Sequence, residues 1–97
     1  MDNRIPIDAK LIVTTDAVPG YQIVRSLGTV EGIGVFVGTG FTIEGQKDRI
    51  NDVLRDAYLD MISKAGKQGA QAIVGLRYVF HSNHIMVYGT AVMIQRN

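Results

Sequence analysis

The stretch AIVGLRYVFHSNHIMVYGTAVMI, residues 72–94, gives the strongest indication of the fold that we expect from this sequence. It contains two runs, 72–80 and 85–94, that are rich in the β-branched and aromatic residues favoured in strands. Only HSNH, residues 81–84, separates them, and Ser82-Asn83 has the length of a two-residue hairpin loop. The stretch therefore predicts an antiparallel β-hairpin.

A two-residue loop also predicts which residues of the hairpin face each other. His81 would lie opposite His84, Tyr78 opposite Val87, and Val74 opposite Ala91. Because side chains alternate across a strand, one face of the hairpin would be almost wholly apolar. Its members would be Ala72, Val74, Leu76, Tyr78, Phe80, Ile85, Val87, Gly89, Ala91 and Met93.

The opposite face of the hairpin is mixed, yet still too apolar to be stable in water. Its members would be Ile73, Gly75, Arg77, Val79, His81, His84, Met86, Tyr88, Thr90, Val92 and Ile94. A sheet that is apolar on both faces needs a cover on both. We therefore expect a helix on the first face and another subunit on the second.

The preceding residues predict that helix. Apolar residues recur there at helical spacing for four turns, and the other side is charged. The apolar set is Ile50, Val53, Leu54, Ala57, Tyr58, Met61, Ile62 and Ala65. Gly69 is expected to stop the helix.

Earlier residues predict two further strands. LIVTT, residues 11–15, has strand composition, and a Pro-Gly turn at 16–20 follows it. A long strand is expected from Tyr21 to about Val37, with glycines that mark bulges or close backbone contacts. Residues 1–10 are interpreted as a flexible leader, and 11–97 as one domain. The expected fold class is α+β: an antiparallel or mixed sheet of about four strands with one long helix.

Composition excludes several classes of function. The chain has 97 residues, a net charge of +1 and only 20% charged residues, so nothing favours nucleic acid or an anionic membrane as partner. No cysteine is present, which excludes disulfides and thiolate sites. The start of the chain lacks the apolar core of a signal peptide, and no apolar stretch approaches the ~20 residues that span a bilayer. We expect a cytoplasmic protein.

Three blocks of the sequence resemble the YbjQ-like family, UPF0145, whose domain is described as heavy-metal-binding. The first comprises residues 13–15, 18–21 and 27–32, the second GAQAIVGLRY at 69–78, and the third YGTAV at 88–92. The resemblance implies a dodecin/YbjQ-like α+β subunit that assembles through its strands into a homopentameric ring. It implies no settled function.

The chain departs from the family pattern in ways that bear on metal binding. The segment 38–46 and the hairpin loop are both shorter than in the family, and no cysteine can serve a soft metal. His81 and His84 would lie about 5 Å apart across the turn, close enough to share a divalent transition metal. Structural zinc takes four ligands and catalytic zinc three, so two histidines form half a site. We prefer the interpretation of a polar hairpin tip, with a weak or intersubunit metal site as the alternative.

Other candidate residues point to assembly. Arg77 would lie opposite Tyr88, either stacked on it in a ligand pocket or paired with another subunit; we favour assembly. Tyr21 and Thr90 are further candidates for an interface or pocket. No serine or threonine has a recognisable base beside it, and the glycines complete no phosphate-binding motif.

The expected function is therefore a non-enzymatic homo-oligomeric module that binds a small ligand or metal. Two alternatives remain: a ring that docks an unidentified protein without any ligand, and a small enzyme with a site between subunits that uses Arg77, Tyr21 or Tyr88.

Overall fold

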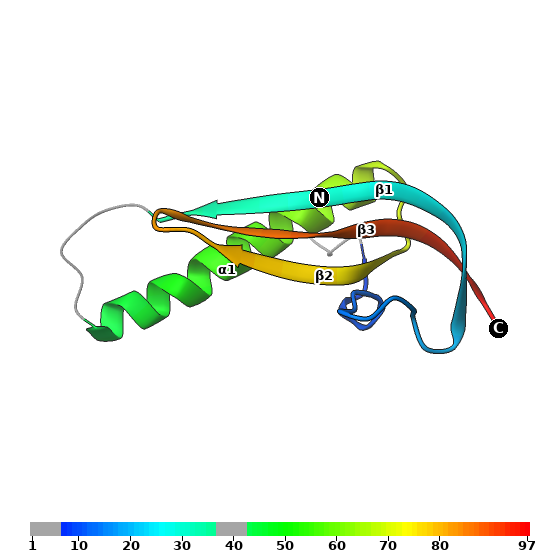
Figure 1. Cartoon of the computed structure of the whole chain (residues 1–97), viewed down its shortest axis with the longest axis horizontal. Helices are drawn as coiled ribbons and strands as arrows, with labels where there is room; N and C mark the ends of the chain where they lie inside the picture. The colour runs from blue at the N-terminus through cyan, green and yellow to red at the C-terminus, as the bar shows by residue number, and fades with distance from the viewer. Residues whose placement is uncertain (1–6, 37–42) are drawn as a thin grey trace, which may run out of the picture.

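The structure, a computed structural model, describes residues 7–36 and 43–97, with only the backbone for 43–48. Its elements are the 3-10 helix η1 (Ala9–Leu11), the strands β1 (Tyr21–Val35), β2 (Ala72–Phe80) and β3 (His84–Arg96), and the helix α1 (Ile43–Lys67). The strands form one antiparallel sheet in the order β1–β3–β2. The helix α1 lies across one face of this sheet (Figure 1). Within the described residues, no helix is long and apolar enough to cross a membrane.

The predicted hairpin is confirmed near its tip. Tyr78 pairs with Val87 and Arg77 with Tyr88, and the His81 N–H donates to the His84 carbonyl at 2.9 Å. The expected pairing of Val74 with Ala91 is wrong, because Val74 pairs with Thr90.

A bulge between Val74 and Arg77 causes this register error. Gly75 adopts a φ of 66°, a conformation that glycine enters without steric cost, and its N–H donates to the Thr15 carbonyl at 2.9 Å. The extra residue reverses the faces of the first part of β2. Ile73 consequently belongs to the core under α1, and Ala72 and Val74 lie on the opposite side.

The predicted strand at residues 11–15 is wrong; the part of the chain that the structure describes has three strands. Asp8 caps η1 by accepting the Lys10 N–H at 2.9 Å, so Leu11 belongs to a helical turn. Ile12 makes a single parallel bridge to Ile73, and the Leu76 N–H donates to the Val13 carbonyl at 3.1 Å. Residues 12–18, here called the N-terminal strap, thus run along the outer edge of β2.

The other expectations for the first third of the chain have mixed outcomes. Residues 1–6 of the predicted leader, Val37 of the predicted strand and much of the 38–46 segment lie outside the described residues. Ile7, by contrast, is only 1% exposed and belongs to the main core. The predicted turn before β1 is present, with Gly20 at a φ of 83° and the Tyr21 N–H bonded to the Val18 carbonyl at 3.0 Å.

The helix packs directly on β1 because two glycines leave room for it. A Cβ built on Gly32 would collide with the backbone carbonyl of Ala57, and one on Gly34 with that of Val53. The predicted apolar stripe of α1 supplies Ala57, Met61, Ile62 and Ala65 to the core, all at most 1% exposed. The sheet contributes to the same core the side chains of Val30, Ile73, Leu76, Val87 and Ala91.

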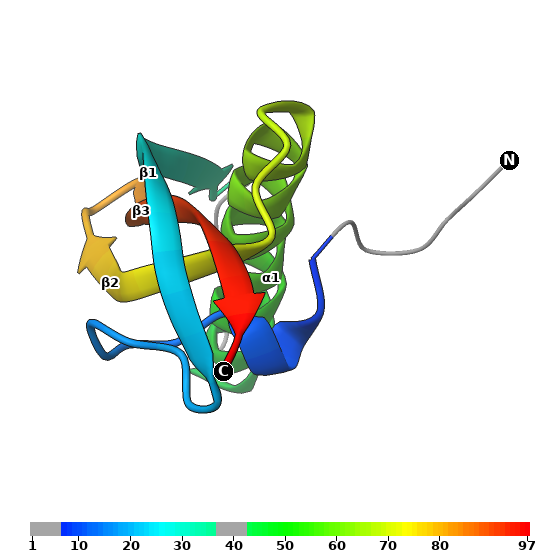
Figure 2. The same cartoon turned by 90° about the vertical axis from the view of Figure 1, so that its right-hand side faces the viewer.

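A smaller core lies on the opposite face of the sheet, at the end where the C-terminus lies. Val18 of the strap packs there with Ala72, Val74 and Val92. Figure 2 shows the N-terminal strap and the C-terminus at this same end of the molecule. The strap therefore covers one end of the second face and leaves the end near the hairpin tip open.

Candidate functional site

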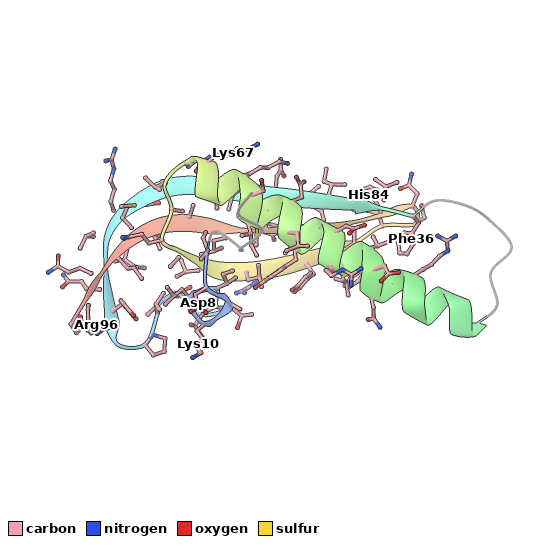
Figure 3. The ribbon with its side chains drawn as sticks, turned by 180° about the vertical axis from the view of Figure 1, so that it is seen from behind. Asp8, Lys10, Phe36, Lys67, His84 and Arg96 are labelled. Atoms are coloured by element: carbon pink, nitrogen blue, oxygen red, sulfur yellow. The ribbon has the colours of Figure 1, made fainter. Side chains whose placement is uncertain are left out.

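The open part of the sheet opposite α1 is the most distinctive surface of the molecule. Gly32 and Val87 point toward the helix, so their neighbours along each strand point away from it. We call this surface the uncovered face; its residues are Thr29, Glu31, Ile33, Val35, Arg77, Val79, His84, Met86, Tyr88 and Thr90. In Figure 1 the strands lie in front of α1, and in Figure 3 the helix lies in front.

The uncovered face exposes large apolar side chains. Ile33 is 44% exposed and Val35 is 56% exposed. Ile33 lies in one row with Met86 and Val79, since β3 pairs with both outer strands. No helix or strand among the described residues packs on this row, and such contiguous apolar patches usually mark interaction sites.

The next row carries charge. Glu31 of β1, Tyr88 of β3 and Arg77 of β2 lie side by side across the sheet. The Arg77 Nη1 donates to the Thr14 carbonyl at 2.9 Å and to the Leu76 carbonyl at 2.8 Å, which holds the guanidinium beside the strap. Thr90, paired with Thr29, follows in the adjacent row. The structure thus brings three of the predicted residues, Arg77, Tyr88 and Thr90, together.

The two histidines meet at the hairpin tip, but as a stacked pair. Their ring centroids are 4.3 Å apart with an interplanar angle of 17°. The Nδ1 of His84 lies 2.7 Å from the Oδ1 of Asn83. The lone pairs of an imidazole lie in its ring plane, so two nearly parallel rings direct them side by side and not toward one point.

A complete metal site does not fit within one subunit as described. In the described ranges no group of three His, Cys, Asp or Glu side chains converges, and the whole sequence lacks cysteine. The thioether of Met86, a soft ligand, lies two residues from His84 on the same face. Any site at the tip would require a ring rotation and ligands from another copy.

Tyr21 lies at the other end of the sheet, apart from the remaining predicted residues. It pairs with Arg96, whose guanidinium carbon is 5.9 Å from the centre of the Tyr21 ring. A hydrogen bond from the Arg96 side chain to Tyr21 raises the pKa of Arg96. This contact fastens the open ends of β1 and β3 to each other.

A second exposed apolar area lies on the helix side of the hairpin tip. Tyr78 is 42% exposed and Phe80 is 62% exposed. Partial burial, and then the electrostatic effect of Tyr78, raise the pKa of Tyr58 on α1. This area carries no charged residue of β2, since Arg77 points to the other face.

Sequence reasoning missed the contribution of β1 to the uncovered face. Glu31, Ile33 and Val35 belong to it because β1 pairs with β3, and no pattern in the sequence near β1 predicts that pairing. The available signal was the alternation of these three residues with Gly32 and Gly34, which separates a side-chain face from a glycine face.

One helix laid on a three-stranded antiparallel sheet, with the opposite face partly open, defines a small α+β domain. A YbjQ family model, described as "Putative heavy-metal-binding", matches residues 36–95. UPF0145 proteins of Burkholderia mallei (strain SAVP1) and Burkholderia pseudomallei (strain K96243) are each 36% identical over 107 residues, covering 92% of this chain and 96% of theirs. The chain belongs to the YbjQ-like UPF0145 family.

A solved structure supports the fold. A DUF74-family protein from Pediococcus pentosaceus, titled as a protein with unknown function, superimposes with a TM-score of 0.67 at 22% sequence identity. The match covers 87% of this chain and 96% of that one. At this identity the likeness concerns the fold alone.

Proposed function

We propose that this protein is a non-enzymatic module that assembles with copies of itself, as a homopentameric ring, and binds a small ligand or metal where subunits meet. The observation that carries the proposal is the uncovered face, where Ile33 and Val35 lie exposed beside Met86 and Val79. Each Å² of apolar surface removed from water stabilises by about 25 cal/mol, so covering this face favours association. The ring and its stoichiometry follow from the family resemblance.

The test of assembly is the mass of the untagged protein by native mass spectrometry at micromolar concentration. We expect a five-fold multiple of the subunit mass. The variant Ile33→Asp, which places a charge in the apolar row, should shift the protein toward monomer, since burying an unpaired carboxylate is strongly unfavourable. Leu59→Asp is the matched control, because Leu59 is similarly exposed at 39% but lies on the helix, away from the uncovered face. A monomeric wild-type protein would overturn the proposal, and equal assembly of Ile33→Asp would place the interface elsewhere.

A second candidate function, binding of a divalent transition metal at the hairpin tips, rests on the contact between His81 and His84. Because each copy supplies only two imidazoles, we expect less than one metal ion per subunit and binding only by the assembled protein.

Calorimetric titration with zinc, nickel and copper measures this stoichiometry. His84→Ala is expected to weaken binding by about tenfold or more, since metal affinity depends on each ligand. Ser82→Ala, at the same tip but without a ligating nitrogen, should bind as the wild type does. Equal binding by His84→Ala and wild type would show that the histidines are not the ligands.

A further inference from the structure

Glu31 and Arg77 occupy the two outer strands of the same row on the uncovered face. Tyr88 of the central strand separates them. Neighbouring strands lie about 4.8 Å apart, so the backbones of these two residues are separated by about 10 Å with a tyrosine ring between. The opposite charges therefore sit at opposite edges of one sheet.

Neither charge is neutralised within the subunit. The Glu31 carboxylate makes no hydrogen bond or ion pair with any residue in 7–36 or 49–97, and Glu31 is exposed. The two described contacts of the Arg77 side chain, both from Nη1, go to uncharged carbonyl oxygens. A guanidinium carries five N–H donors and binds a carboxylate in a bidentate manner, so Arg77 keeps donors with which to bind a carboxylate.

These charges discriminate between the two ways in which copies can meet edge to edge. A two-fold contact of β1 with β1 that is centred on this row would gather two Glu31 carboxylates, and such a contact of β2 with β2 would gather two Arg77 guanidinium groups. Arg25, the cation of β1, does not compensate Glu31, because it pairs with Met93 and so lies on the opposite side from Ser26 and Val92. Like charges brought together at an interface strongly disfavour association. A contact of β1 with β2 brings opposite charges together.

Resting on the proposed assembly, we infer that copies join head to tail, with Glu31 of one copy bound to Arg77 of its neighbour. The β1 edge of one copy meets the β2 edge of the next from Arg77 to Phe80, beyond the part that the N-terminal strap occupies. A heterologous contact of this kind generates rings when its rotation closes. The row of Ile33 and Val79 lies beside the charged row and would be covered at the same joint.

At the centre of this joint the two copies meet through side chains and not through a backbone hydrogen-bond ladder. Asp60 of α1 already accepts the outward N–H of Ile33 at 3.1 Å and pairs with Lys64 at 3.2 Å. That N–H is consequently not available for a backbone ladder to another copy. The side chains of Glu31 and Arg77 determine which edge is accepted.

Charge reversal tests the joint by native mass spectrometry and sedimentation. Glu31→Arg, which breaks no described contact of the subunit, is expected to raise the dissociation constant of the assembly by about 100-fold or more, and Arg77→Glu likewise. The double variant Glu31→Arg/Arg77→Glu restores the pair with its signs exchanged and should recover most of the assembly. Asp56→Arg, an exposed charge reversal on α1, should assemble as the wild type does.

The outcomes separate this inference from the proposal beneath it. A wild-type protein that is monomeric overturns the assembly itself. An assembled wild type whose Glu31→Arg variant is equally assembled overturns the joint alone. Since Arg77 also holds Thr14, Arg77→Glu is checked for folding by circular dichroism, and a folded double variant no better assembled than Glu31→Arg also overturns the pairing.

Discussion

Replacing Gly32 with alanine is expected to lower the free energy of unfolding by about 3 kcal/mol or more. The added Cβ would occupy the space of the Ala57 carbonyl and approach the backbone of Met61. Both obstacles are main-chain atoms of a helix, which cannot rotate aside as a side chain can. The helix must therefore move off β1, and the packing of Met61, which is fully buried, is lost with it.

Chemical denaturation measures the effect of Gly32→Ala. The protein concentration is held fixed, because the proposed assembly would make stability depend on it. Gln22→Ala is the control on the same strand; its side chain is exposed, so a change within about 0.5 kcal/mol is expected. A Gly32→Ala variant as stable as that control would mean that α1 and β1 do not approach as closely as described.

Ile73→Ala is expected to cost about 2–5 kcal/mol, the range for truncating a fully buried isoleucine. Ile73 is 0% exposed in the core under α1 and also pairs with Ile12 of the N-terminal strap. Truncation leaves a cavity between the helix and the sheet and loosens the strap. The midpoint of denaturation, compared with wild type, reports the loss.

Ile50→Ala is the matched control for Ile73→Ala, because it is the same substitution at a side chain that is 40% exposed. We expect it to be nearly neutral, since alanine also has the higher helix propensity. If Ile73→Ala were equally mild, Ile73 would belong to the other face, and the bulge at Gly75 that turns it inward would be absent.

The parts of the fold that sequence predicts well are those fixed by local spacing. The two-residue loop at Ser82-Asn83 sets the pairing of Tyr78 with Val87, because each step along one strand matches a step along the other. The stripe through Ala57, Met61 and Ala65 likewise depends only on helical period.

The parts that sequence does not predict depend on distant partners. Glycine inside a strand signals a bulge in general, yet only the bond from Gly75 to Thr15 selects this one. Residues 11–15 have strand composition, but Asp8 caps a helical turn that includes Leu11. The pairing of Arg77 with Tyr88 follows from the hairpin, but Glu31 joins them only because β1 pairs with residues far along the chain, so the charged row emerges only in three dimensions.

The strand order β1–β3–β2 also constrains how the chain is made. Tyr21 pairs with Arg96 and Val35 with His84, so β1 has no strand partner in the subunit until β3 has left the ribosome. The helix and the β2–β3 hairpin join residues closer in sequence, and local contacts of this kind form faster than distant ones. The apolar side of β1 is thus the surface most in need of protection in a nascent chain, and a chaperone that engages it would act on the same residues for which we propose contact with another copy.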